Sequence, residues 1–184
     1  MSCNSCCKRL KATLASMIAA SMLLCAFGAQ ASDWHEELPQ ARPTGQGEMR
    51  WFGLSIYSAT LWSEHRPFDE HAPFALQLVY HRHINHDRIV HTSVEEIQRL
   101  YEGRFTADKL KQWEALMSRA FPDVEDGDQL VGIFIPGHGC RFYSAHGLIT
   151  DIADPEFAQA FFAIWLDPRT KDHRLRSSLL GIAP

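Results

Sequence analysis

Residues 126–168 read DGDQLVGIFIPGHGCRFYSAHGLITDIADPEFAQAFFAIWLDP and predict three strands followed by a helix. The apolar runs 129–135 and 140–145 flank a Pro-Gly-His-Gly sequence. This sequence predicts a β-hairpin, because proline fixes φ and glycine tolerates positive φ. A third run, 148–152, follows after a further glycine. Asp154 is expected to cap the next helix, since the proline after it suits the first helical position.

The helix that follows this cap carries large apolar side chains on one face. Their spacing of three or four residues is the period of an amphipathic helix. Such a face needs an apolar surface to cover, and the preceding strands supply one. We therefore expect a β-β-β-α unit in which the helix packs on the sheet. The side chains of this face are Phe157, Phe161, Ile164 and Trp165.

The first 31 residues have the composition of a secretory signal peptide. Three basic residues at positions 8–11 precede the apolar residues 12–27 and the cleavage sequence Ala-Gln-Ala at 29–31. The apolar run is shorter than the ~20 residues of a bilayer-spanning helix. We expect cleavage before Ser32, a periplasmic or secreted protein, and no transmembrane segment in the mature chain. The alternatives are a retained anchor and lipidation at Cys25, although a leucine precedes this cysteine.

Composition limits the partners of the mature chain. Removing residues 1–31 takes away three cations and no anion, so the net charge changes from −4 to −7. An acidic chain is a poor partner for nucleic acid. Cys140 is the only cysteine beyond the leader, which excludes an intramolecular disulfide. His81 and His83 would share a strand face, but no cysteine or carboxylate at ligand spacing accompanies them. We expect neither a metal nor a cofactor.

The mature chain is expected to form one domain, residues 47–184, after a mobile lead-in at 32–46. Strands are predicted at 48–62, where Gly53 marks either a turn between two strands or a kink in one, and at 74–82. The order of strands, two helices, strands and helix predicts an α+β fold, with a mainly antiparallel sheet and helices on one face. The predicted helices follow caps at Asn85, Thr106 and Asp154, and a last one covers residues 173–180.

Arg50 is a cation within an apolar stretch. Glu48, Arg50 and Phe52 alternate and share one strand face unless a bulge intervenes. An arginine that faces an apolar layer costs free energy unless it is paired, so Arg50 is a candidate anion-binding residue. The alternative is an ion pair with Glu48 on the solvent side. Tyr57 and Tyr80 lie on neighbouring predicted strands and could contribute hydroxyl donors.

Four segments together resemble the chalcone isomerase-like proteins, in particular their secreted bacterial branch. The resemblance covers residues 45–180 and implies an open-faced β-sandwich. In that fold, a ligand cleft lies between a large antiparallel sheet and the helices packed on one side of it. The segments are GEMRWFGLSIYSATLW, FALQLVYHRHI, FPDVEDGDQLVGIFIPGHGCRFYSAHG and DPEFAQAFFAIWLDPRT.

The resemblance implies two kinds of activity. Plant members cyclise a chalcone with an Arg, a Thr, a Tyr, an Asn and a polar residue on a late helix. Other members bind fatty acids through an Arg and a Tyr without catalysis. Here Phe52 stands where the Thr would be, the segment that matches the Tyr and Asn contains no Tyr, and the late-helix position falls near Phe162. Arg42 or Arg50 remains as the candidate Arg.

We therefore expect a non-catalytic binder of an apolar acid such as a fatty acid, with no catalytic residues. Arg50 or Arg42 would pair with the ligand carboxylate, and Phe52, Tyr57 and Tyr80 would form the wall of the site. An alternative is an isomerase or intramolecular lyase that acts on an unsaturated, chalcone-like substrate. A third alternative is an interaction partner for an envelope protein.

Overall fold

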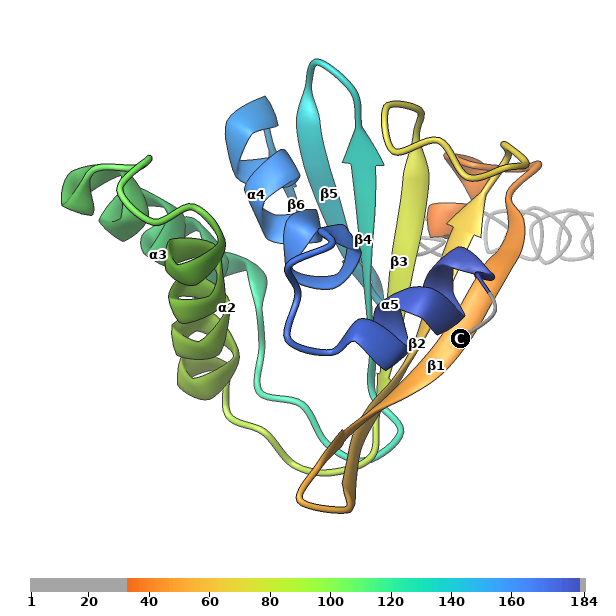
Figure 1. Cartoon of the computed structure of the whole chain (residues 1–184), viewed down its shortest axis with the longest axis horizontal. Coiled ribbons are helices and arrows are strands. Elements are labelled where there is room, and N and C mark those ends of the chain that lie inside the picture. Colours follow the sequence, from red (N-terminus) through yellow and green to blue (C-terminus); the bar gives the residue numbers. More distant parts are fainter. Residues whose placement is uncertain (1–32, 183–184) are drawn as a thin grey trace, which may run out of the picture. The chain divides into compact units, whose positions relative to one another are not determined.

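The computed structural model describes residues 33–182, and the leader predicted at residues 1–31 lies outside them. These residues contain a six-stranded antiparallel sheet in which every strand pairs with its neighbours in the sequence (Figure 1). The predicted hairpin and third strand are confirmed. The strands are β1 (Arg42–Trp51), β2 (Leu54–Ser63), β3 (Phe74–Tyr80), β4 (Gln129–Ile135), β5 (Gly139–Ser144) and β6 (Gly147–Ile152).

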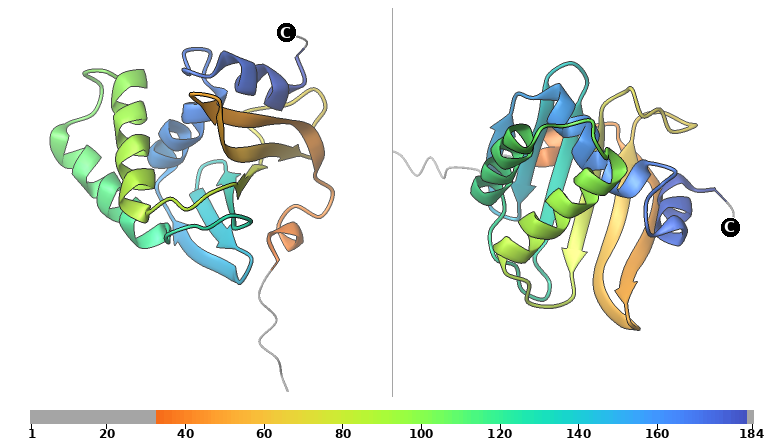
Figure 2. Two further views of the ribbon diagram at one scale, coloured as in Figure 1. Left: turned by 90° about the horizontal axis from the view of Figure 1, so that it is seen from below. Right: turned by 60° about the vertical axis from the view of Figure 1, so that its left-hand side comes forward.

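Helices cover one face of this sheet, which confirms the α+β arrangement (Figure 2). The predicted caps are present, because the side chains of Asn85, Thr106 and Asp154 each accept a hydrogen bond from a backbone N–H in the first turn. No helix among residues 33–182 is long and apolar enough to cross a membrane. The helices on this face are α2 (His86–Leu100), α3 (Ala107–Ala120), α4 (Pro155–Leu166) and α5 (His173–Leu180), whereas the 3-10 turn η1 (Trp34–Glu36) lies against the other face.

The main core lies between the sheet and these helices. Strand alternation directs Leu76, Leu78 and Tyr80 of β3 to the helix-covered face, and the apolar face of α4 packs against the same layer. Phe157 of α4 is fully buried there. The helix-on-sheet unit predicted from residues 126–168 is therefore confirmed, and it forms the centre of the domain.

Two glycines in β1 allow α5 to lie directly on the sheet. A Cβ atom on Gly45 would lie 2.0 Å from the backbone oxygen of Ser178, and one on Gly47 would lie 2.8 Å from the side chain of Leu175. Both distances are shorter than any van der Waals contact. Glycine at these positions therefore sets how closely the helix approaches β1.

The segment before residue 47 is more ordered than the expected mobile lead-in. β1 already begins at Arg42, and η1 places Trp34 against the other face of the sheet, where Trp34 is 3% exposed. Arg141 on β5 holds this segment through two 2.8 Å hydrogen bonds to the carboxylate of Glu37. A few long-range contacts order these residues, and such contacts leave no periodic pattern in the sequence.

Candidate functional site

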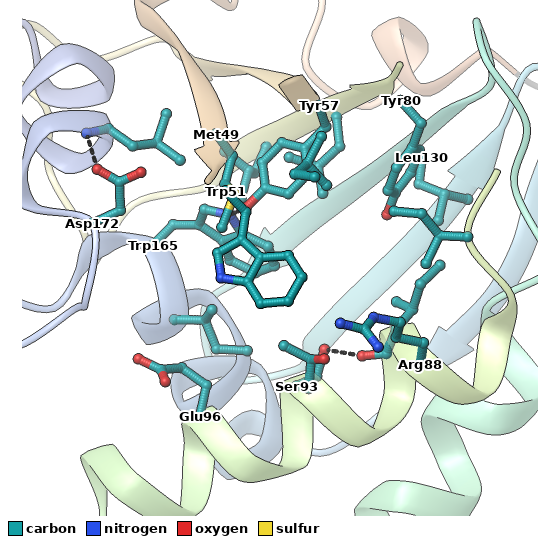
Figure 3. Close-up of a pocket in the computed structure, with 18 of the residues that line it drawn as sticks. Met49, Trp51, Tyr57, Tyr80, Arg88, Ser93, Glu96, Leu130, Trp165 and Asp172 are labelled. Atoms are coloured by element: carbon teal, nitrogen blue, oxygen red, sulfur yellow. Dashed lines mark hydrogen bonds between the residues drawn. The ribbon is translucent and has the colours of Figure 1, made fainter. Parts of the chain in front are cut away.

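A cleft of about 1420 Å³ lies between the helix-covered face of the sheet and helices α2, α4 and α5 (Figure 3). This exceeds the ~300–1,000 Å³ that is typical of small-ligand pockets. Most of its inner lining is aliphatic or aromatic. The floor contains Leu76, Leu78, Leu130 and Phe142, and α4 contributes Phe161, Phe162, Ile164 and Trp165.

Gly132 allows aromatic rings to pack closely on the floor of the cleft. A Cβ atom at this position would lie 3.1 Å from ring atoms of both Phe142 and Phe162. The ring of Phe162 also packs edge-on against Phe74, with 5.0 Å between the ring centroids. The absent side chain thus leaves room for α4 to bring its rings onto the sheet, and the resulting floor is apolar and closely packed.

Two tyrosines form a polar layer within the cleft. Tyr57 on β2 and Tyr80 on β3 are register partners, and their ring centroids are 6.0 Å apart. The Tyr57 hydroxyl accepts a hydrogen bond of 2.9 Å from Nε1 of Trp165, which leaves its own proton free to donate. The Tyr80 hydroxyl makes no hydrogen bond within residues 33–182, although the side chain is only 3% exposed.

Burial also fixes the protonation of these two phenols. Removal from water raises the pKa of Tyr57 far above its ordinary value, and the hydrogen bond from Trp165 offsets this only in part. Burial raises the pKa of Tyr80 in the same way, and the neighbouring Tyr57 adds to the effect. Both hydroxyls therefore stay protonated at neutral pH and can serve as hydrogen-bond donors.

The cleft changes in polarity along the strands. At the rim, Trp51 from the end of β1 lies beside Arg88 of α2, whose guanidinium carbon is 5.6 Å from the centroid of the indole ring (Figure 3). The tyrosine layer comes next, and Leu78 and Leu76 follow at successive inward-facing positions of β3. A ligand in this cleft would meet cations first, then hydroxyl donors, then an apolar floor.

The buried carboxylate in the lining has a structural role. Glu96 on α2 accepts hydrogen bonds from Arg99 and lies 2.8 Å from Nζ of Lys171, which precedes α5. Burial alone would raise the pKa of Glu96, but the bonds from Arg99 and Lys171 hold it below its ordinary value. Glu96 therefore stays ionised and links α2 to the segment between α4 and α5.

Cys140 is an unsuitable nucleophile. Cys140 is fully buried in the main core. Burial raises the pKa of its thiol far above the ordinary value, and the charges of Asp151 and Asp154 add to the effect. The thiolate that nucleophilic catalysis needs is therefore strongly disfavoured.

The structure brings three of the five predicted site residues to the cleft. Tyr57 and Tyr80 lie inside it, and Arg50 lies at its rim. Arg50 is exposed and donates hydrogen bonds of 2.7 Å to Glu48 and 3.0 Å to the backbone oxygen of Gly53. This is the surface pairing that was the alternative for Arg50.

Arg42 and Phe52 lie outside the cleft lining. Arg42 is at the opposite end of β1 from the rim, where it donates to the backbone oxygen of Ala41. Phe52 is 87% exposed because it occupies the turn between β1 and β2 rather than a strand position. A register shift between Met49 and Arg50 also breaks the simple alternation on which the predicted shared face depended.

Sequence reasoning missed the contributions of Trp51 and of α2 to this site. Ser93 and Glu96 are polar residues within the buried side of α2, which also includes Val90 and Ile97. Such polar positions in an apolar stripe are a usable signal for a cleft-lining helix. The position of Trp51 could not be read in the same way, because it depends on how the β1–β2 hairpin leans toward α2.

The histidines at the end of β3 have separate partners. Nε2 of His81 lies 2.8 Å from the Ser58 hydroxyl, and Nδ1 of His83 lies 2.7 Å from Glu125. Among residues 33–182, no group of three or more His, Cys, Asp or Glu side chains is placed to hold a metal ion.

Comparison with known proteins agrees with this architecture. The sequence profile of the family described as chalcone isomerase-like matches residues 47–181. A protein of Haemophilus influenzae, described as uncharacterised, is 30% identical over 141 residues, which are 76% of this chain and 68% of that protein. The crystal structure of an Arabidopsis thaliana fatty-acid binding protein covers 77% of this chain and 87% of its own, with a TM-score of 0.59. At 10% identity, this likeness concerns the fold alone.

Proposed function

The chain belongs to the chalcone isomerase-like family, and we propose that it binds an apolar acid such as a fatty acid without transforming it. One observation carries the proposal: a large cleft with an apolar floor has two protonated phenol hydroxyls at one end. An apolar chain gains free energy on leaving water for such a floor. A carboxylate accepts hydrogen bonds from the hydroxyls, and the cleft therefore matches both ends of the ligand.

The order of the lining residues suggests how this ligand would lie. The acyl chain would extend over Leu76 and Leu78 toward Phe162, and its carboxylate would accept hydrogen bonds from the hydroxyls of Tyr57 and Tyr80. The Tyr80 hydroxyl supports this pose because Tyr80 lines the cleft and its hydroxyl makes no hydrogen bond within residues 33–182. This hydroxyl is therefore available to donate to an anionic acceptor, and a hydrogen bond to a charged group is stronger than one between neutral groups.

The cations at the rim would favour an acid over a neutral lipid. Arg50 and Arg88 both line the mouth of the cleft. Arg50 is already paired with Glu48, so its direct contribution to a carboxylate is modest. Arg88 stacks on Trp51 and has no carboxylate partner among residues 33–182, so its charge remains available to an anion.

The cleft supports binding better than the isomerase alternative. Acid–base chemistry needs a titratable group that is free to exchange protons with the substrate. The carboxylate of Glu96 is held in ion pairs, and that of Asp172 caps α5 by accepting a hydrogen bond from the backbone N–H of Leu175. Phe162 supplies only apolar surface where the plant enzymes have a polar residue.

We propose a periplasmic or secreted location for this protein. The support is the basic, apolar and small-residue pattern of residues 1–31. An apolar acid is poorly soluble in water, so an exported binder could hold it between membranes. Cell fractionation tests this part, and protein found with its leader attached in the cytoplasm would contradict it.

The decisive experiment is displacement of a fluorescent fatty acid from delipidated protein. Palmitate is expected to displace the probe with a single-site stoichiometry, whereas palmitate methyl ester, which lacks the charge, is expected to displace it more weakly. If neither palmitate nor other saturated fatty acids displaced the probe, the proposal would fail. Steady loss of an enone chromophore in the presence of the protein would instead favour the isomerase.

A further inference from the structure

The tip of the β1–β2 hairpin exposes an unusual concentration of apolar surface. Trp51 is 52% exposed, Phe52 is 87% exposed and Leu54 is 52% exposed. They are three of the five large exposed hydrophobic side chains in the described part of the chain. Figure 1 shows this tip reaching beyond the loops that join β3 to α2 and α3 to β4. We call the turn of residues 51–54 the apex.

Turn geometry does not explain the phenylalanine at the apex. Phe52 has a φ of 48° and Gly53 has a φ of 80°, so both lie in the left-handed region. Two-residue turns of this kind favour asparagine followed by glycine, and a bulky residue at the first position is strained. Phe52 gains no compensation from burial. A strained and exposed aromatic side chain is a sign of function rather than of folding.

Polar contacts on the strands hold the apex in a fixed shape. Arg50 donates to Glu48 and to the backbone oxygen of Gly53, and the Ser55 hydroxyl donates to the same glutamate. The rings of Trp51 and Phe52 pack against each other, with 5.1 Å between their centroids. The apex is therefore a braced, preformed apolar surface.

Guanidinium groups surround this surface. Arg50 bonds to the turn, Arg82 donates a 2.9 Å hydrogen bond to the backbone oxygen of Ser55, and Arg88 stacks on Trp51. Glu48, the nearest carboxylate on the hairpin, is neutralised by Arg50. This cationic end contrasts with a chain whose net charge is −4. Aromatic side chains flanked by arginines suit the boundary between acyl chains and phosphate headgroups.

We propose that the apex docks onto a lipid bilayer that contains anionic headgroups. Phe52, Trp51 and Leu54 would enter the interfacial region of the bilayer. Arg50, Arg82 and Arg88 would contact lipid phosphates, for which a guanidinium group has matching hydrogen-bond geometry.

The apex adjoins the rim of the cleft, so docking would bring the cleft close to the bilayer. Trp51 belongs to both the apex and the cleft rim, where Arg88 faces it. A ligand could thus pass between the bilayer and the cleft without crossing bulk water. This transfer step rests on the proposed function, whereas docking itself does not.

Co-sedimentation with vesicles tests the docking. The purified protein is mixed with vesicles of phosphatidylcholine, with or without phosphatidylglycerol, and the bound fraction is measured at low and high salt. Wild type is expected to bind the anionic vesicles and to bind less as salt screens the arginines. Phe52→Asn is expected to bind about tenfold more weakly, because it removes one inserted aromatic side chain.

This substitution keeps the fold intact, since asparagine tolerates the left-handed conformation. The control is Leu148→Asn, which removes another exposed apolar side chain, 50% exposed, from β6 at the opposite edge of the sheet. This variant is expected to bind vesicles like wild type. Circular dichroism and urea unfolding verify that both variants fold.

Two results would overturn the proposal. The first is wild-type protein that does not bind anionic vesicles, which is the result expected if the apex binds a protein partner. The second is a folded Phe52→Asn variant that binds these vesicles as well as wild type. Displacement of the fluorescent fatty acid, measured without vesicles, is a separate readout that Phe52→Asn should not change. Vesicle binding without any fatty-acid binding would leave docking standing and remove the transfer step.

Discussion

The hydroxyl oxygen of Tyr57 accepts a hydrogen bond of 2.9 Å from the indole nitrogen of Trp165. This bond joins β2 to α4 across the cleft and leaves the Tyr57 proton free to donate to a ligand. Tyr80, its partner on β3, has no equivalent bond within residues 33–182. Two side chains of the same type therefore differ in what they do for the fold, although both offer a donor to a ligand.

Substitution of each tyrosine by phenylalanine should separate these roles. Tyr57→Phe leaves the buried N–H of Trp165 without an acceptor and should lower the free energy of unfolding by about 1–3 kcal/mol. Tyr80→Phe breaks no bond and should change it by less than about 0.5 kcal/mol. Both should weaken fatty-acid binding several-fold. Urea unfolding and probe displacement provide the two measurements, and full affinity in Tyr80→Phe would refute the carboxylate pose.

The two candidate arginines can be compared directly. Arg50→Ala removes a cation from the rim of the cleft and should weaken palmitate binding by about two- to fivefold, as expected for a screened charge. Arg42→Ala removes a cation at the other end of β1 and should leave the affinity unchanged. Titration of both variants with palmitate tests this prediction. Equal losses of affinity in the two variants would show that palmitate binding depends on the net charge of the protein and not on the position of the arginine.

Because α5 packs closely on β1, we expect substitution of Gly45 to lower the stability of the fold strongly. Gly45→Ala places a methyl group 2.0 Å from the backbone oxygen of Ser178, so the helix must move, at a cost of about 3 kcal/mol or more. The control is Gly103→Ala, at a φ of 73° with open space around it, which should cost about 1 kcal/mol. Chemical unfolding measures both, and a smaller effect at Gly45 than at Gly103 would contradict the observed approach.

Asp154 should make stability depend on acidic pH. Burial alone would raise its pKa, but hydrogen bonds from the N–H of Phe157, the indole of Trp113 and Nζ of Lys109 together hold it below the ordinary 3.8. A lowered pKa in the folded state stabilises the fold above pH 3.8, and this contribution disappears as the pH falls through the lower folded value.

Asp154→Asn keeps the helix cap but loses the charge. This substitution should lower the free energy of unfolding by about 1–2 kcal/mol at neutral pH. The difference in stability from wild type should shrink as the medium is acidified below pH 4. Urea unfolding across this range provides the test. The matched variant Asp123→Asn removes an exposed carboxylate that bonds to His86 and should cost much less. If Asp154→Asn lowered the free energy of unfolding by the same amount at every pH, the lowered pKa of Asp154 would be contradicted.

The fold was largely predictable because its signals are local. The Pro-Gly-His-Gly turn and the side-chain caps at Asn85, Thr106 and Asp154 each act within a few residues. Their effects can be read from the sequence without knowledge of the rest of the chain. The apolar face of α4 likewise follows from helical period alone.

The site was less predictable because it depends on contacts between distant segments. Tyr57 and Tyr80 lie together in the cleft lining, since each follows the alternation of its strand. Phe52 was expected in a strand, but the two-residue turn removes it from the sheet. Gly45 falls within the segment that the sequence predicts to be mobile, because nothing near it in the sequence indicates that α5 lies on it.

The packing of α5 on β1 has a consequence for the order of folding events. It is a contact between the two ends of the described chain, while every strand pairs with its sequence neighbour. Closing the longest loop carries the largest entropic cost, so we expect this contact to form after the transition state. Gly45→Ala should therefore accelerate unfolding and leave the refolding rate nearly unchanged. The helix that completes the cleft would then also set how long the native protein persists.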